Sequence, residues 1–131
     1  MIESKLTLGK NVTARDSVSD SNTAKAVGSG SLKVYATPMM IALMECAACL
    51  CLEDCLEPGE TSVGTEINVS HKAASPLGAE IEASATIKQI SGRKIEFTVT
   101  ASDNAGEIGS GEHTRVIVDV ERFTEKVSRR K

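Results

Sequence analysis

Three polar residues stand in apolar surroundings, and their types are those of base, acid and nucleophile chemistry. Glu45 lies within a long apolar stretch, where an unpaired carboxylate is costly and needs a partner or a proton. His71 ends a row of alternating apolar residues, and a carboxylate beside it would fix its tautomer and support its basicity. Thr37 stands at a predicted helix start, where backbone N–H groups favour developing negative charge. Together they are candidates for acid–base or nucleophilic chemistry.

Each of the three also has a purely structural interpretation. Thr37 is a suitable N-cap residue, with Pro38 at the first helical position. A single histidine such as His71 is often a satisfied core or interface residue. Glu45 fits a solvent-facing or subunit-interface position. The Thr37 hydroxyl serves chemistry only if it is not committed to capping.

A fourth candidate lies on the last predicted strand. Gly109, Gly111, His113 and Arg115 have the same parity and therefore share one face of that strand. Glycines within a strand mark the close approach of another backbone or of a ligand. Arg115 is then a cation on a face of small residues, either at a ligand or as an ordinary surface charge.

The four cysteines lie close together in the sequence, at Cys46, Cys49, Cys51 and Cys55. A zinc site would need two separated pairs with turn residues between the members of each pair. This stretch has no Gly or Pro and is typical of continuous helix, in which disulfides are sterically unfavourable. We therefore predict that the cysteines pack in the core, without a metal.

One long helix must position Thr37 and Glu45. It is predicted over residues 38 to about 56 and ends before Pro58-Gly59. At 1.5 Å per residue its length is roughly 28 Å. Because it is apolar nearly all round, we expect it to be buried on most faces, with the remainder of the chain wrapped around it.

That remainder has the alternation of β-strands. Apolar and polar residues alternate over residues 63–71, 81–88 and 94–101, a long last strand covers 108–120, and turns fall at 91–92 and 103–106. Parity places Val63, Thr65, Ile67, Val69 and His71 on one face. Short strands are also predicted at 5–12 and around 23–27, and a polar tail after 120. The architecture is α+β: an antiparallel curved sheet wrapped around one long central helix.

Composition narrows the function classes. The 131 residues predict a single domain spanning 1–131, and a net charge of −3 with 2% aromatic residues argues against nucleic-acid binding. The polar N-terminal residues and an apolar stretch of only 39–52 predict a cytoplasmic protein without a membrane segment. Phosphate-loop, dinucleotide-binding, zinc-protease and nucleophile-elbow motifs are missing from the sequence.

Several short motifs in their order along the chain resemble hot-dog thioesterases of the fluoroacetyl-CoA thioesterase type. The resemblance covers residues from about 35 to the C-terminus, and the spacings from Thr37 to Glu45 and from Glu45 to His71 agree with that family's catalytic set. The motifs are Val34-Tyr35-Ala36-Thr37-Pro38, Leu43-Met44-Glu45, Gly59-Glu60-Thr61-Ser62-Val63-Gly64-Thr65, Val69-Ser70-His71, Gly92-Arg93, Ala101 with Asp103, Ile108-Gly109-Ser110-Gly111 and Arg115.

The resemblance implies a hot-dog fold and hydrolysis of acyl-CoA thioesters, without a cofactor. It implies catalytic roles for Thr37, Glu45 and His71, and contact of Gly64 and Arg115 with the acyl group of the substrate. It also implies a homodimer with active sites at the subunit interface. The fluoroacetate-specific enzyme has an aromatic lid before the helix, where this chain has residues 28–32 without Phe. We therefore expect a different small or medium acyl group.

Two other functions remain open at this point. One is a non-catalytic module that binds an acyl thioester or another small ligand, because fold does not fix function. The other is a 3-hydroxyacyl thioester dehydratase, whose histidine precedes the helix acid, whereas no histidine precedes Glu45 in this chain. A covalent and a water-mediated hydrolysis also remain open: Glu45 either orients His71 or attacks as a carboxylate nucleophile, and Thr37 positions or activates the nucleophile.

Overall fold

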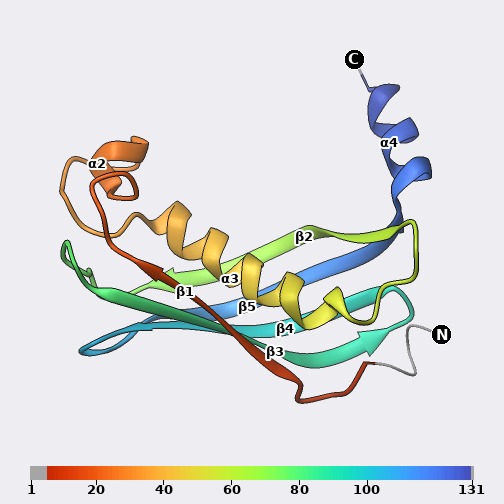
Figure 1. Cartoon of the computed structure of the whole chain (residues 1–131), viewed down its shortest axis with the longest axis horizontal. Coiled ribbons are helices and arrows are strands. Elements are labelled where there is room, and N and C mark those ends of the chain that lie inside the picture. The colour runs from red at the N-terminus through yellow and green to blue at the C-terminus, as the bar shows by residue number, and fades with distance from the viewer. Residues whose placement is uncertain (1–5, 131) are drawn as a thin grey trace.

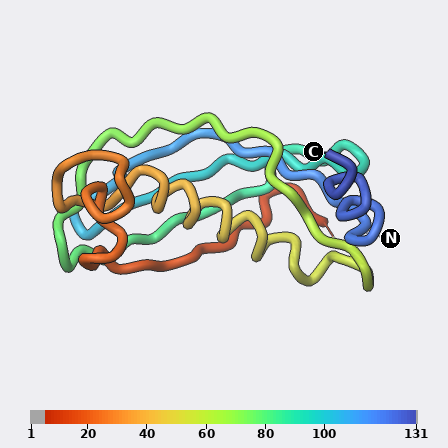
Figure 2. Tube along the Cα trace, turned by 90° about the horizontal axis from the view of Figure 1, so that it is seen from above, coloured from red at the N-terminus to blue at the C-terminus, as the bar shows by residue number. Residues whose placement is uncertain are grey.

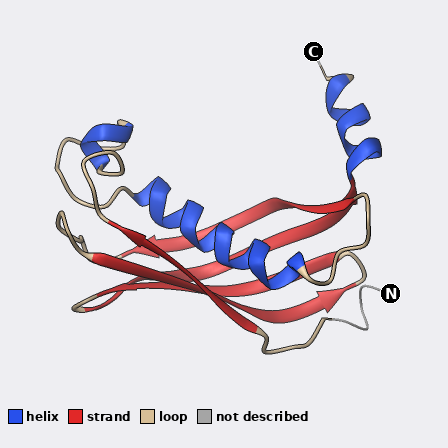
Figure 3. Cartoon of the chain, viewed as in Figure 1, coloured by secondary structure: helices blue, strands red, loops and turns tan. Residues whose placement is uncertain are grey.

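The computed structural model describes residues 6–130 and contains a five-stranded antiparallel sheet with one long helix across its face (Figures 1 and 3). The sheet has the order β1-β3-β4-β5-β2, so β1 and β2 form opposite edges (Figure 2). The elements are β1 Asn11–Ser17, α2 Ala24–Val27, α3 Thr37–Glu53, β2 Glu60–His71, β3 Glu80–Ser91, β4 Lys94–Asp103, β5 Gly106–Asp119 and α4 Val120–Ser128.

Helix α3 confirms the predicted long helix but differs at both ends. Its N-cap is Ala36, so Thr37 is the first helical residue, and the predicted N-cap role of Thr37 is wrong. The helix ends at Glu53, slightly earlier than expected. Burial follows the helical period through Met40, Met44, Ala47, Ala48, Cys51 and Leu52, which pack on the sheet.

The side of α3 that faces away from the sheet is open. Ala42, Cys46, Cys49 and Leu50 are exposed, so the predicted burial on most faces is wrong for this side. All four cysteines are free, and only Cys51 and Cys55 pack in the core as predicted. Among residues 6–130, no group of side chains is arranged to hold a metal ion.

The meander of β3, β4 and β5 is confirmed. Both predicted turns join neighbouring strands, and the apolar rows face α3. These rows are Ile81, Ala83, Ala85 and Ile87 on β3, and Ile95, Phe97, Val99 and Ala101 on β4. Strand β2 returns to pair with β5 at the sheet edge.

The predicted parity of β2 is confirmed for Val69 and His71 but is wrong for Val63, because a β-bulge interrupts the strand between them. Gly64 pairs with Arg115 and Glu66 with Thr114, so Thr65 is the extra residue. The bulge reverses the faces on its N-terminal side. As a result, Gly64 shares the helix-facing side with Val69 and His71, whereas simple alternation places Gly64 on the opposite face.

Both ends of the chain differ from the sequence predictions. The described residues before position 11 form a turn, and the first strand begins at Asn11; Lys5 lies outside the described residues. Residues predicted as a strand around 23–27 form the short helix α2, which Thr23 caps. The predicted polar tail is the amphipathic helix α4. No helix in the described part of the chain is long and apolar enough to cross a membrane.

Candidate functional site

The start of α3 and the end of β2 bring Thr37 and His71 into direct contact. Thr37 Oγ1 lies 2.7 Å from His71 Nδ1. Because Ala36 is the N-cap and makes no side-chain cap bond, the Thr37 hydroxyl is not committed to capping. A hydroxyl bonded to an imidazole is the arrangement of a nucleophile, or a water-positioning group, beside its base.

His71 is set up to act as a neutral base. Burial lowers its pKa below the ordinary value, and the backbone of Ala73 opposes this only in part. The imidazole is therefore uncharged at neutral pH. If the Thr37 hydroxyl donates to Nδ1, the ring proton lies on Nε2. That Nε2 is buried and has no hydrogen-bond partner among the described residues, so an acceptor is missing from a single chain.

A hollow of about 320 Å³ opens in front of Thr37 and His71. Small side chains form part of its wall, at Ala24, Ser29, Val34, Ala73 and Ala74, and Lys72 adds a longer, charged one. Tyr35, also in the lining, is fixed by donating its hydroxyl hydrogen to Asp16 Oδ2 at 2.9 Å. This hydrogen bond connects β1, which contains Asp16, to the residues directly before α3, and so helps to fix the position of Thr37.

The amides at the start of α3 supply less than the sequence suggested. Pro38 has no N–H, while Met39 and Met40 both donate to the Ala36 carbonyl. Of these first helical residues, Thr37 alone has an N–H that makes no hydrogen bond within residues 6–130. An oxyanion at this helix end would therefore rely on that amide together with the helix dipole.

A second cluster surrounds Glu45, in the middle of α3. Arg115 Nη1 lies 3.3 Å from Glu45 Oε2, and the guanidinium also donates to the Ser62 hydroxyl and carbonyl at 2.9 and 3.0 Å. Gly64 closes the cluster, because a Cβ there would lie 2.8 Å from Glu45 Oε2 and 3.2 Å from Arg115 Nη1. Glu45 is half-buried, with its side chain 41% exposed.

His113 completes this second cluster. Its Nδ1–H donates to the Glu66 carbonyl at 2.7 Å, which leaves Nε2 to accept from Arg115 Nη1 at 3.2 Å. Burial lowers the pKa of His113, and the charge of Arg115 lowers it further. Sequence reasoning placed His113 and Arg115 on one face correctly, but it missed that His113 and Ser62 orient the guanidinium.

One chain does not bring Glu45 to His71. Glu45 lies eight residues after Thr37, which is about 12 Å along a helix. Its carboxylate is paired with Arg115 instead. Within a single chain Glu45 is therefore placed beside Arg115, and a contact between Glu45 and His71 would need a second copy of the chain.

Comparisons with known proteins place these residues in context. The sequence model described as "Fluoroacetyl-CoA-specific thioesterase" matches residues 18–121. A fluoroacetyl-CoA thioesterase from Streptantibioticus cattleyicolor is 42% identical over 95 residues, covering 72% of this chain and 68% of the relative.

Two solved structures are similar over nearly the whole fold. A variant of the fluoroacetyl-CoA-specific thioesterase FlK, in complex with fluoroacetate and CoA, is 34% identical with a TM-score of 0.86, covering 90% of this chain and 99% of that chain. A hot-dog-like protein from Thermanaerovibrio acidaminovorans is 25% identical with a TM-score of 0.87, covering 95% and 93%. The antiparallel sheet with one long helix across its face is therefore a hot-dog fold, as expected.

Proposed function

The chain belongs to the fluoroacetyl-CoA-specific thioesterase family, and from this membership we propose that it hydrolyses a small or medium acyl-CoA to the free acid and CoA. It is thus a hydrolase of the thioesterase class. The hollow before Thr37 and His71 is lined by small side chains together with Tyr35 and Lys72, and phenylalanine is not among its lining residues. We propose an acyl group other than fluoroacetyl on that basis. A cytoplasmic location is part of the same proposal.

The contact between Thr37 and His71 carries the catalytic assignment. Neutral His71 takes the proton of the attacking hydroxyl, which belongs to Thr37 or to a water that Thr37 holds. The oxygen adds to the thioester carbonyl, the C–S bond then breaks, and the departing thiolate receives the proton from His71. If Thr37 attacks, water hydrolyses the acyl-threonine ester in a second cycle.

Glu45 joins this set through a second copy of the chain. The outer edge of β2 has no strand beside it in the described chain, and residues 64–68 are exposed. Antiparallel pairing of two β2 strands would bring the middle of one strand near the end of the other. The Glu45 cluster of one protomer then approaches Thr37 and His71 of its partner, and a carboxylate there is the acceptor that His71 Nε2 lacks.

Gly64 and Arg115 would line the acyl end of this composite site. Gly64 leaves free the space that a Cβ would fill beside Glu45. Arg115 is buried but keeps its charge directed toward the same space, because Ser62 and His113 hold the guanidinium. A cation here would favour a polar or polarised acyl group and the oxyanion formed from it.

The test is release of free CoA from a panel of short and medium acyl-CoAs, quantified by mass spectrometry. A thiol reagent is avoided because Cys46 and Cys49 are exposed. We expect turnover by the wild type, loss of at least about a hundredfold in kcat for His71→Ala, and no change for Thr98→Ala, an exposed position on β4.

Three outcomes contradict the proposal in different ways. Ligand recovered intact would indicate a binding module. An enoyl thioester without free CoA would indicate a dehydratase. Full turnover by folded His71→Ala would remove His71 from the chemistry. Intact-mass analysis of enzyme quenched during turnover separates the routes, since an acyl adduct on Thr37 appears only in the covalent one.

A further inference from the structure

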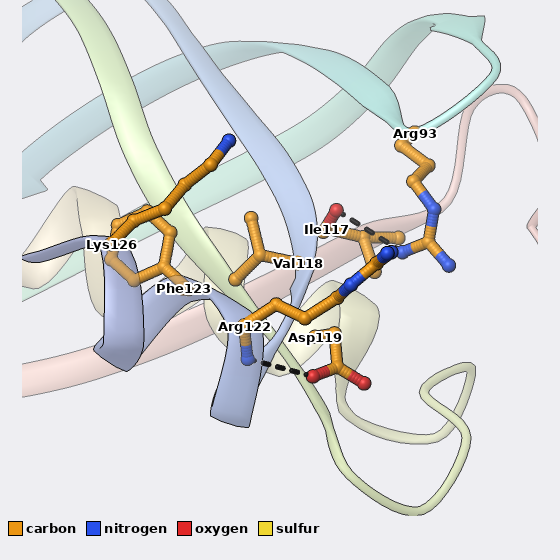
Figure 4. A pocket seen from close by; sticks show the side chains of 7 residues that line it. All are labelled: Arg93, Ile117, Val118, Asp119, Arg122, Phe123 and Lys126. Carbon is orange, nitrogen blue, oxygen red and sulfur yellow. Dashed lines mark hydrogen bonds between the residues drawn. The ribbon is translucent and has the colours of Figure 1, made fainter.

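A second pocket lies at the opposite end of β2 from Thr37 and His71. Its volume is about 540 Å³, and it is formed by the end of β5, the first turns of α4 and Arg93 beside the β3–β4 turn (Figure 4). Arg93, Arg122 and Lys126 supply three cations to its lining. This concentration of positive charge contrasts with the net charge of −3 of the chain.

Two of these cations have no counter-charge in the part of the chain that the structure describes. Arg93 is held by Glu60 at 2.7 Å and by the Ile117 carbonyl at 3.2 Å. Among residues 6–130, the side chains of Arg122 and Lys126 form no ion pair or hydrogen bond. In Figure 4 the Arg122 side chain extends toward that of Arg93. Guanidinium groups that face one pocket repel each other unless an anion lies between them.

The pocket contains one carboxylate, and that group is already engaged. Asp119 caps α4 by accepting from the Arg122 backbone N–H at 3.0 Å. The pocket therefore keeps an excess of positive charge. Phosphate is the anion that arginine and lysine pairs of this kind bind best, since a guanidinium donates two parallel hydrogen bonds to it.

An aromatic ring lies beside the cations. Phe123 lines the pocket and is 37% exposed, in a chain with one other Phe and one Tyr. With Ile117 and Val118 it provides an apolar wall next to the charged groups. Cations beside an exposed aromatic face suit a purine nucleotide, whose phosphates pair with the charges while its base stacks on the ring.

The distance from this pocket to Thr37 and His71 determines which chain can hold the thioester end of a nucleotide-bearing substrate. Glu60, which holds Arg93, and His71 are the first and last residues of β2, and the eleven steps between them span about 36 Å. Figure 1 also places α4 at the end of the sheet opposite α2. A CoA thioester is too short to join these two places within one chain.

We propose that this pocket binds the phosphate-bearing nucleotide of the acyl-CoA whose thioester lies at Thr37 and His71 of the partner protomer. The proposal rests on the proposed function and on the antiparallel β2 dimer. In that dimer, the Glu60 end of one β2 lies near the His71 end of the other. The α4 helix of one protomer therefore binds the nucleotide of the substrate whose thioester lies at Thr37 and His71 of the other protomer.

The first test compares acyl-CoA with acyl-pantetheine, which lacks the nucleotide. In Arg122→Gln/Lys126→Gln, we expect the KM for acyl-CoA to rise about tenfold, while the KM for acyl-pantetheine changes less than twofold. Arg15→Gln/Lys88→Gln, which removes two exposed surface cations, is the charge-matched control and should change neither. Equal changes for both substrates, or none for acyl-CoA, would overturn the proposal. Failure of the thioesterase function itself would show as no turnover of either substrate by the wild type.

The second test asks which chain supplies the pocket. His71→Ala dimers, exchanged with Arg122→Gln/Lys126→Gln dimers, form mixed dimers that contain one intact His71 and one intact α4 on different chains. If each pocket binds the substrate of the partner protomer, the mixed dimers should turn over acyl-CoA with the low KM of the wild type. A mixture that keeps the raised KM would assign the pocket to its own chain and refute the proposal.

Discussion

At the scale of single residues, the pKa of His71 determines how activity depends on pH. Burial lowers this pKa below the ordinary histidine value, so the imidazole takes up a proton only under acidic conditions. We expect kcat/KM to rise with pH through this lowered pKa, below 6.5, and to be level at neutral pH. The measurement is a pH–rate profile from pH 4.5 to 8.

The control is an NMR titration of the imidazole groups. The chain has two histidines, so His71→Ala assigns both resonances. A midpoint of the activity profile that follows the His71 resonance supports its role as base. An acid limb centred above 6.5, or one that persists in His71→Ala, contradicts it.

Gly64 shows how a missing side chain shapes the Glu45 cluster. An added Cβ would lie 2.8 Å from Glu45 Oε2 and 3.1 Å from His113 Cε1. Gly64→Ala must therefore displace the Glu45–Arg115 pair, at a cost of about 1–3 kcal/mol in the free energy of unfolding. Chemical denaturation measures this cost.

Gly30→Ala is the matched control for that substitution. A Cβ at Gly30 would meet only the Ala24 Cβ, at 3.3 Å. We expect a change in stability of at most about 0.5 kcal/mol for this exposed position. Equal free energies of unfolding for the Gly64→Ala and Gly30→Ala variants would show that the Glu45 cluster can accommodate a Cβ at position 64 without a steric clash.

At the scale of secondary structure, α3 divides the cysteines into two classes. Cys51 is fully buried, its Sγ lies 3.4 Å from the Ala85 carbonyl, and burial raises its pKa. Cys46 and Cys49 are exposed on the open side. In the native protein we expect alkylation at Cys46 or Cys49 and none at Cys51, with all four thiols reacting in denaturant. Peptide mass mapping after brief labelling gives the answer, and native labelling of Cys51 would be inconsistent with this packing.

The secondary structure also shows what sequence alone could predict. The period of two located β3 and β4 and much of β5, and Pro38 located the start of α3, because burial on a regular element imposes a regular pattern. The bulge at Thr65 has no such pattern, since it depends on the register with β5. Because the alternating pattern does not reveal the bulge, the pattern alone could not place Gly64 on the same face as Arg115.

The candidate site divides in the same way. Residue types and spacing identified Thr37, Glu45, His71 and Arg115 as candidates. Their grouping into two separate clusters depends on helix rise and strand pairing, which link distant parts of the chain. Helix α4 was predicted as a polar tail, although Val120, Phe123 and Val127 have the spacing of one helix face; all three are exposed in the described chain.

At the scale of the whole molecule, the exposed edge of β2 connects assembly to catalysis. Ile67 is 37% exposed on this edge, one of the large apolar side chains that the described chain leaves uncovered. If two β2 strands pair near Ile67, Ile67→Lys places like charges opposite each other and disfavours association. We expect the wild type to have twice the chain mass of 13.8 kDa and the variant to have the mass of one chain, by light scattering.

The same variant tests whether the site needs both copies. Because Glu45 lies about 12 Å along the helix from Thr37 in its own chain, a folded monomer would contain the Thr37–His71 contact without a carboxylate at Nε2. Its kcat should therefore fall about a hundredfold or more, while Leu8→Lys, at an exposed residue outside the sheet, stays dimeric and active. A monomeric Ile67→Lys with full turnover would show that Glu45 acts within its own chain or not at all. The loss of both dimer and turnover, with the circular dichroism of the fold intact, is the result that joins the two clusters into one active site.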